Sequence, residues 1–257
     1  MIKNSFFLLS LMCAGALSSI AYAEEPKAAE DHARWAIGGL GMYQTNIYRD
    51  GEAEFNALPW VEFEYGKFSL DRNKITYELY ENDWFEIAPV IEADFQGYEA
   101  ADSPFLGGMK DRDMAFHAGV EGEIEVGPAE IEFGLRQDIT GTNKGFIGEL
   151  SVGLDAPVTD NLMLGASVGA EYYSSKYSDY YYGVTASEAR AGRAQYDVGG
   201  TINPTIELNA QYRISESWKA GMMAEYIHFD SKISDSPIID ASGQGQVMFG
   251  VAYEFYH

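Results

Sequence analysis

Residues Gly245–Phe255 read GQVMFGVAYEF, and large apolar side chains alternate in this stretch with polar or small ones. Successive side chains of a β-strand point to opposite faces, so the stretch has two unlike faces. One face carries Val247, Phe249, Val251, Tyr253 and Phe255, and the other carries Gln246, Met248, Gly250, Ala252 and Glu254. A strand of about ten residues with one apolar face is typical of a transmembrane β-barrel, in which one face meets lipid and the other lines the lumen.

The same alternation recurs along most of the chain. We expect strands over 34–45, 54–65, 67–72, 74–81, 84–96, 114–125, 129–139, 145–156, 161–173, 200–213, 217–230 and 245–256. This makes twelve strands if 67–81 is a hairpin, and ten if Phe68–Tyr80 does not cross the membrane. The connections alternate between short and long, as in bacterial barrels with short periplasmic turns and long outer loops. The sequence therefore predicts an all-β fold: one antiparallel transmembrane β-barrel over residues 34–257.

A soluble β-sandwich or a lipocalin-like barrel would also show alternation. The aromatic residues favour the membrane barrel, because they crowd the ends of the expected strands, as rings do at a water–lipid interface. Examples are Trp35, Tyr65, Trp84, Tyr172 and Trp218.

The N-terminus predicts export. Lys3 supplies a positive charge, 6–17 form a short apolar core, and Ala21-Tyr22-Ala23 is a small-x-small cleavage site. We expect residues 1–23 to be a cleaved signal peptide and 24–33 an acidic periplasmic leader, which places the barrel in the outer membrane of a Gram-negative bacterium. The single cysteine, Cys13, lies in the signal, so the mature chain has no disulfide.

The polar faces of two neighbouring strands, 114–125 and 129–139, are rich in carboxylates. An ionised group facing hydrocarbon costs about 2–4 kcal/mol near the midplane, so these groups are expected in the lumen. The expected acidic lining with its cation is Glu121, Glu123, Glu125, Glu130, Glu132, Asp138 and Arg136. Such a lumen suits a narrow cation-preferring pore, or an interior filled by hydrogen-bonded side chains that conducts nothing. The sequence leaves both open.

Composition and motifs exclude several functions. A net charge of −23 excludes nucleic acid as a partner. The expected neighbours are outer-membrane lipid and lipopolysaccharide, whose phosphates divalent cations could bridge to loop acids. With four histidines and no flanking pattern of an activated serine, we predict no enzymatic activity, no catalytic residue, no metal site and no cofactor.

Three outer loops and the C-terminus carry longer motifs. They are GMKDRD at 108–113, YYGVTASEA at 181–189, DSPI at 235–238 and GVAYEF at 250–255. The loop positions singled out are Gly108, Met109, Asp111, Arg112, Asp113, Tyr181, Tyr182, Gly183, Val184, Asp235, Ser236 and Pro237. With this combination the whole mature chain resembles the MltA-interacting protein / OmpV family of outer-membrane proteins.

The resemblance implies a barrel that serves as a scaffold between a lytic transglycosylase and a bifunctional murein synthase, with surface adhesion as a further possibility. It implies no catalytic residues. At the C-terminus Gly250, Tyr253 and Phe255 look like the signal read by the barrel-assembly machinery, although Tyr256-His257 extends past it.

We expect the loop positions to be structural. Gly183 can take a positive φ, Pro237 can stiffen a turn, and Asp111, Arg112 and Asp113 can pair with one another. The expected periplasmic turns are short, so the leader would have to help in binding a periplasmic partner.

Overall fold

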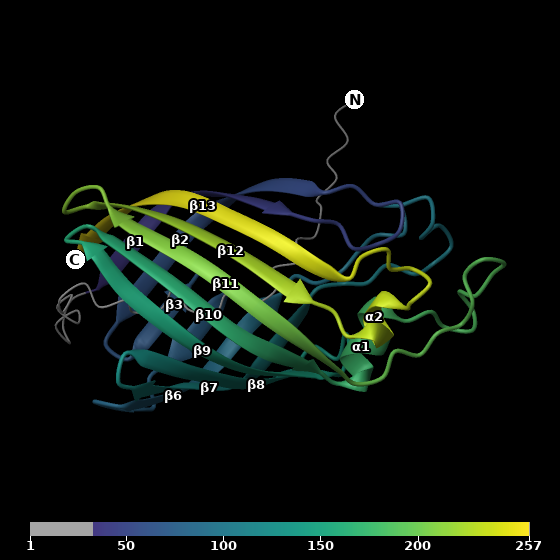
Figure 1. Cartoon of the computed structure of the whole chain (residues 1–257), viewed down its shortest axis with the longest axis horizontal. Helices are drawn as coiled ribbons and strands as arrows, with labels where there is room; N and C mark the ends of the chain where they lie inside the picture. Colours follow the sequence, from purple (N-terminus) through teal and green to yellow (C-terminus); the bar gives the residue numbers. More distant parts are fainter. Residues whose placement is uncertain (1–32, 257) are drawn as a thin grey trace.

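The computed structural model describes residues 33–256, in which thirteen strands form one antiparallel sheet that closes into a barrel (Figure 1). The predicted signal peptide and all but the last residue of the predicted leader lie outside the described residues. The strands are β1 (Arg34–Gln44), β2 (Glu54–Tyr65), β3 (Phe68–Asp71), β4 (Lys74–Tyr77), β5 (Tyr80–Asn82), β6 (Phe85–Asp94), β7 (Ala115–Val126), β8 (Ala129–Asp138), β9 (Phe146–Thr159), β10 (Leu162–Tyr173), β11 (Thr201–Arg213), β12 (Trp218–His228) and β13 (Gly243–Tyr256).

The barrel is closed at two seams. β1 pairs with β13 along its whole length, from Arg34 opposite Tyr256 to Gln44 opposite Gln246. At the other seam β4 pairs with residues 90–92 of β6, and β5 pairs with residues 85–87 of the same strand. β4 and β5 are therefore two pieces of one interrupted strand, and the prediction of twelve strands is confirmed.

The hairpin β3–β4 is much shorter than its neighbours. At its tip the Arg72 amide donates to the Val61 carbonyl (3.0 Å), and the Asn73 side chain donates to the Ala93 carbonyl (2.8 Å). The hairpin therefore joins β2 to β6 only up to Val61 on β2. From Glu54 to Trp60, β2 is paired with β1 alone among the strands that the structure describes.

Two prolines occur where the wall lacks a neighbour. Backbone groups along a strand point alternately to its two sides. The Val61 carbonyl accepts from the hairpin. The backbone of Pro59, two residues earlier, therefore points to the same side of β2, but at a level that the hairpin does not reach. The Ala93 amide donates to Asn73, so Pro89 points toward the break between β4 and β5. Proline has no N–H, and at these positions an N–H would face a side on which the described strands offer no partner.

The two faces of the wall differ as predicted. Outward side chains are apolar and exposed, including Leu135 (53%) and Val168 (59%), whereas inward Arg136 is 4% exposed. Trp218 stacks edge-on against Tyr253 at the end of the barrel with the short turns, and Phe255 also faces outward there. The rule of short inner turns makes this the periplasmic end.

The outer end carries two short helices, α1 (Ser175–Tyr182) and α2 (Ser231–Ser234), within the long loops (Figure 1). In the described part of the chain, neither helix has the length or the apolar character needed to cross a membrane.

Two adjacent residues of β10 allow a test of which face of the wall meets lipid. Val168 lies mid-wall between Val152 and Ile206 and faces outward, whereas its neighbour Ser167 faces inward beside Glu207. We expect Val168→Lys to destabilise the barrel by about 2–4 kcal/mol, because it places a charge in hydrocarbon. The measurement is urea unfolding in lipid vesicles.

Ser167→Lys is the matched control, since its ammonium group would meet carboxylates in the lumen. Equal destabilisation by the two variants would contradict the assignment of faces.

Candidate functional site

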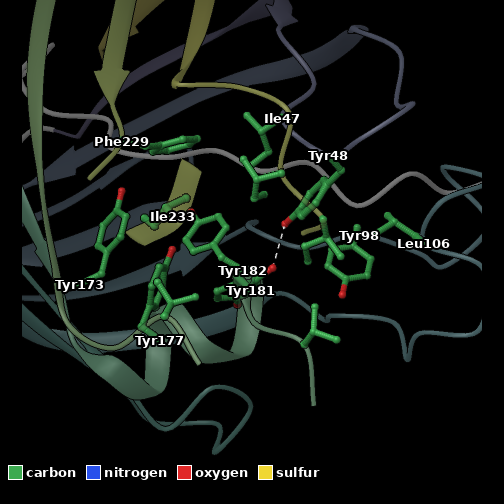
Figure 2. Packing of buried hydrophobic residues seen from close by; sticks show 14 of the residues in the cluster. Ile47, Tyr48, Tyr98, Leu106, Tyr173, Tyr177, Tyr181, Tyr182, Phe229 and Ile233 are labelled. Atoms are coloured by element: carbon green, nitrogen blue, oxygen red, sulfur yellow. Dashed lines mark hydrogen bonds between the residues drawn. The ribbon is translucent and has the colours of Figure 1, made fainter. Parts of the chain in front are cut away.

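A cluster of buried side chains, many of them aromatic, packs at the outer end of the barrel (Figure 2). Tyr173 comes from the end of β10, and the remaining rings come from the loops and helices above it. The central members are Tyr48, Tyr98, Tyr173, Tyr177, Tyr181, Tyr182, Phe229 and Ile233. We call this cluster, with the loop segments 97–113, 174–199 and 229–242 that supply or hold it, the plug.

Helix α1 contributes most to the plug. Tyr177, Tyr181 and Tyr182 lie on one helical face and are each at most 1% exposed. Buried phenolic hydroxyl groups need partners. The Tyr48 hydroxyl donates to the Tyr181 carbonyl (3.4 Å), as Figure 2 shows, and the Tyr181 hydroxyl donates to the Asp113 carbonyl (3.1 Å). Burial raises the pKa of Tyr177 and Tyr182 well above the ordinary value, so both stay neutral.

A buried ion pair joins two of the predicted loop motifs. One guanidinium nitrogen of Arg112, Nη2, lies 3.0 Å from both carboxylate oxygens of Glu188. Arg112 Nε also donates to the Tyr180 carbonyl (2.6 Å) and Nη1 to the Lys110 carbonyl (2.8 Å). Both side chains are at most 5% exposed. The pair therefore fixes the 97–113 loop to the 174–199 loop.

The predicted mutual pairing of Asp111, Arg112 and Asp113 is wrong. Arg112 forms a β-bridge with Tyr98, and in extended backbone neighbouring side chains point to opposite sides. Arg112 is consequently buried in the plug while both aspartates are exposed. The Asp111 carboxylate accepts from the Ala100 amide (2.7 Å) instead.

Glu188 is held in its ionised form. Burial alone would raise the pKa of Glu188, but this effect is outweighed by donors around the carboxylate. These are the Lys110 amide, the hydroxyl and amide of Thr185, and the Arg112 guanidinium, which together lower the pKa of Glu188 to about 2.

The third motif also enters the plug. Ser236 donates through its hydroxyl to the Tyr182 carbonyl (2.6 Å), and Ile239 forms a β-bridge with Tyr48. Pro237 lies between these contacts, and Asp235 ends α2. From the first motif, Met109 is 6% exposed in the same cluster. Three motifs separated by up to about 130 positions therefore meet in one structure.

The glycines of these motifs differ from each other. Gly108 has φ +85°, a conformation that favours glycine. Gly183 has φ −84°, so the prediction that it uses a positive φ is wrong. A Cβ at Gly183 would lie 2.4 Å from the Asp179 carbonyl oxygen, so the residue is small because the backbone passes close to it. Val184 follows it and pairs with Tyr196.

The lumen below the plug contains a network of ion pairs. Arg136 Nε lies 3.1 Å from a Glu92 oxygen, and the same guanidinium contacts Glu121 and Glu149. Lys74 from the short hairpin lies 3.0 Å from Glu121. The side chains come from β4, β6, β7, β8 and β9, so the network ties the short hairpin to the acidic wall.

Carboxylates accumulate toward the periplasmic end of the same wall. Glu123 lies directly opposite Glu132 and Glu125 directly opposite Glu130 in the β7–β8 ladder. Ser151 donates to Glu132 (2.8 Å). Like charges at directly opposed positions repel, and a bound cation or basic segment would relieve that repulsion.

Asp138 lies on the same inward face of β8 as Arg136, opposite His117, but near the outer end of the barrel. It ends β8 on the outer side, and its carboxylate accepts the backbone amides of Thr140, Gly141, Asn143 and Lys144. Its carboxylate therefore organises the short loop after β8.

Two plug residues were missed by sequence reasoning. Glu188 lies inside a quoted motif and Arg193 five residues later, in a loop without periodicity. Arg193 is 1% exposed and donates to the carbonyls of Phe105 (2.6 Å) and Glu188. The sequence feature that could have indicated these two residues was the high density of tyrosine and charged residues in the longest loop, 174–199.

Comparison with known proteins gives relatives along nearly the whole chain. The sequence model of the family described as "MltA-interacting protein MipA" matches residues 37–255. Outer membrane protein OmpV of Vibrio cholerae is 26% identical, covering 97% of this chain and 98% of that protein, and Omp26La of Vibrio anguillarum is 24% identical with the same coverage.

Two further similarities are more distant or shorter. The MltA-interacting protein of Escherichia coli is 33% identical over 34% of this chain and 36% of that protein. Among solved structures, KdgM porin in complex with disordered oligogalacturonate has a TM-score of 0.43 at 12% identity and covers 86% of this chain and 99% of that one.

The Glu188 carboxylate gives a pH-dependent test of the plug. Its folded pKa lies below the ordinary value, so its contribution to loop closure is complete above about pH 4.3 and is lost as the pH falls through about 2. We expect Glu188→Gln to favour local opening by about 3–5 kcal/mol at pH 7, because it leaves Arg112 without its charge partner. The difference from the native chain should shrink between about pH 4 and pH 2.

Hydrogen exchange at the Lys110 and Thr185 amides measures the opening. Asp197→Asn is the control, because this acid lies in the same loop with an exposed side chain. A Glu188→Gln effect of the same size at pH 2 and pH 7 would refute the assignment.

Proposed function

The chain belongs to the MltA-interacting protein family of outer-membrane β-barrels, and from that premise we propose that it is a non-enzymatic scaffold for peptidoglycan remodelling. Its partners in this proposal are a lytic transglycosylase and a murein synthase, held at the periplasmic face of the outer membrane. One relative is named for its interaction with MltA, which supports the choice of partner.

The plug is the observation that carries the proposal. Buried tyrosines packed against one another lie at the outer end of the barrel, where a solute would enter, and the Arg112–Glu188 ion pair fixes two of the loops that surround them. Such dense packing does not favour a continuous aqueous path through the barrel. With its outer end packed in this way, the barrel would meet periplasmic proteins at its periplasmic rim.

The periplasmic rim has a charge that suits a basic partner surface. Its turns carry exposed acids at Asp83, Asp160 and Glu216, and Glu125 is exposed near the end of β7. The β5–β6 hairpin adds exposed Tyr80 (53%) at the same end, and within residues 33–256 the order of paired strands ends at β5. Charge complementarity of this kind steers association and sets orientation. The predicted leader would add further acids.

Site-specific crosslinking tests the scaffold. A photoreactive residue at Glu216 or Asp160 should capture a transglycosylase or murein synthase from cell envelopes, identified by mass spectrometry. The same residue at Asp197 is the control, because it lies in an outer loop. Equal capture from Asp197, or none from the periplasmic sites, would remove the scaffold role.

The acidic wall favours a second function, cation conduction when the plug opens. The opposed pairs of β7 and β8 would concentrate cations below the plug. In planar bilayers we expect no steady current from the native chain. Glu188→Gln, which loosens the plug, should give cation-selective openings.

Neutralising Glu121, Glu123, Glu130 and Glu132 to glutamine in the Glu188→Gln background should abolish that selectivity. An unchanged reversal potential in this variant would exclude the acidic wall as the selective element. Large steady currents from the native chain would favour a pore over a scaffold.

A further inference from the structure

A cleft lies at the outer end of the barrel, between two segments that are distant in the sequence. Residues 44–48 and Glu54, around the connection from β1 to β2, form one side of it. Residues 96–98, 102, 103 and 106, which follow β6, form the other side, and Gln244 of β13 completes the lining. A ligand in this cleft would therefore contact the barrel wall and the 97–113 loop at once.

The charge of the cleft is negative. Glu54 and Asp102 line it, and no lysine, arginine or histidine of the described chain is among its lining residues. Asp102 is held in place because its carboxylate accepts the Glu99 amide (2.7 Å). Arg49 lies in the connection from β1 to β2, but its guanidinium lies over the Phe105 ring, 5.1 Å from the ring centre. A cation in the cleft would therefore meet two carboxylates without a positive charge in the lining.

Gln96 presents a buried acceptor in this cleft. The Tyr48 hydroxyl donates its proton to the Tyr181 carbonyl (3.4 Å), so the same oxygen can only accept from Gln96 Nε2 (3.2 Å). This contact fixes the side-chain amide with its nitrogen toward Tyr48. Gln96 is 1% exposed, and its Oε1 has no donor among the described residues.

Gln244 presents a second buried acceptor. It lies on the inward face of β13, two residues before Gln246, and is 6% exposed. Its Oε1 likewise lacks a donor in the part of the chain that the structure describes. A buried acceptor without a donor is unfavourable, and native proteins keep few such groups. Two of them in one cleft indicate a ligand that brings its own donors.

A metal ion fits this lining less well than an organic cation. Ca²⁺ takes about six to eight oxygen ligands around one point. Within residues 33–256, no group of three or more acids, histidines or cysteines could hold a metal ion. An organic cation tolerates acceptors spread along a cleft, because each N–H group can use a different one.

The lining as a whole defines the chemistry of the ligand. An alkylammonium group, like that of lysine, has three N–H donors, no acceptor and a full positive charge at pH 7. Ile47, Tyr98 and Leu106 also line the cleft and suit the methylene groups of such a molecule. We propose that this cleft binds a small protonated aliphatic amine, whose N–H groups donate to the two amide oxygens and whose charge is balanced by the two acids.

Isothermal calorimetry on the full chain folded in detergent tests the site. The probe is putrescine, which carries an ammonium group at each end of a short methylene chain. The matched neutral ligand is 1,4-butanediol, in which hydroxyl groups replace the ammonium groups. We expect one equivalent of putrescine to bind and the diol to give no heat of binding.

Variants of the lining separate the cleft from the general charge of the loops. Glu54→Gln and Gln244→Leu should each weaken putrescine binding by about tenfold or more, since each removes a partner of a charged donor. Glu52→Gln is the matched control, because it removes the same charge two residues away, where the exposed side chain is not part of the lining. Heat-modifiable migration on gels checks that each variant is folded.

Putrescine binding that weakens in both cleft variants and persists in Glu52→Gln supports the site. Lack of binding by the native chain overturns it, as does undiminished binding by folded Glu54→Gln. Equal weakening by Glu52→Gln would overturn it by showing attraction to loop charge in general. Equal binding of 1,4-butanediol would overturn it by showing recognition without charge. Binding of Ca²⁺ alone, with the same dependence on Glu54 and Gln244, would make the cleft a metal site and would also overturn the proposal.

Discussion

Backbone hydrogen bonding in hydrocarbon is the constraint on which this structure depends. Each unpaired N–H or C=O group in lipid costs several kcal/mol, so the sheet has to close. The pairing of β1 with β13 supplies one seam and the pairing of β4 and β5 with β6 the other. Where pairing fails, beyond Val61 and at the break after β4, prolines reduce the number of donors left without partners.

The same scarcity of water explains how charge is arranged. Carboxylates cannot face lipid, so they gather inside, and Arg136 and Lys74 are placed where several of them can be neutralised at once. Lys74 belongs to the short hairpin, so the weakest part of the wall is joined to the acidic wall by an ion pair. Charge in the lumen thereby contributes to holding the barrel closed.

The sequence allowed the strands and their faces to be predicted because a two-residue rhythm is a local property. Most strand ends fell within two residues of the structure, and the hairpin at 67–81 was found because Arg72-Asn73-Lys74 interrupts two alternating runs. The division of that second run into β4 and β5 was not predicted, because it depends on how β6 pairs with each piece.

The plug was beyond sequence reasoning for the opposite reason. Its motifs could be recognised in the sequence, but Arg112 pairs with Glu188, 76 positions away. No local sequence pattern predicts a contact over that separation. Adjacent aspartates looked like better partners because they were near in sequence. Likewise, Met42, Met223 and Met248 lie on strands β1, β12 and β13. That they are neighbours can be recognised only once the register of these strands is known.

Joining the first strand to the last has a consequence for biogenesis. The ladder from Arg34 opposite Tyr256 joins two strands about 220 positions apart, so it cannot form until β13 has been synthesised. Until that ladder forms, β1 and β13 each present an edge whose N–H and C=O groups lack these partners. Exposed edges of this kind are costly in hydrocarbon, so closing this seam and entering the membrane are coupled steps.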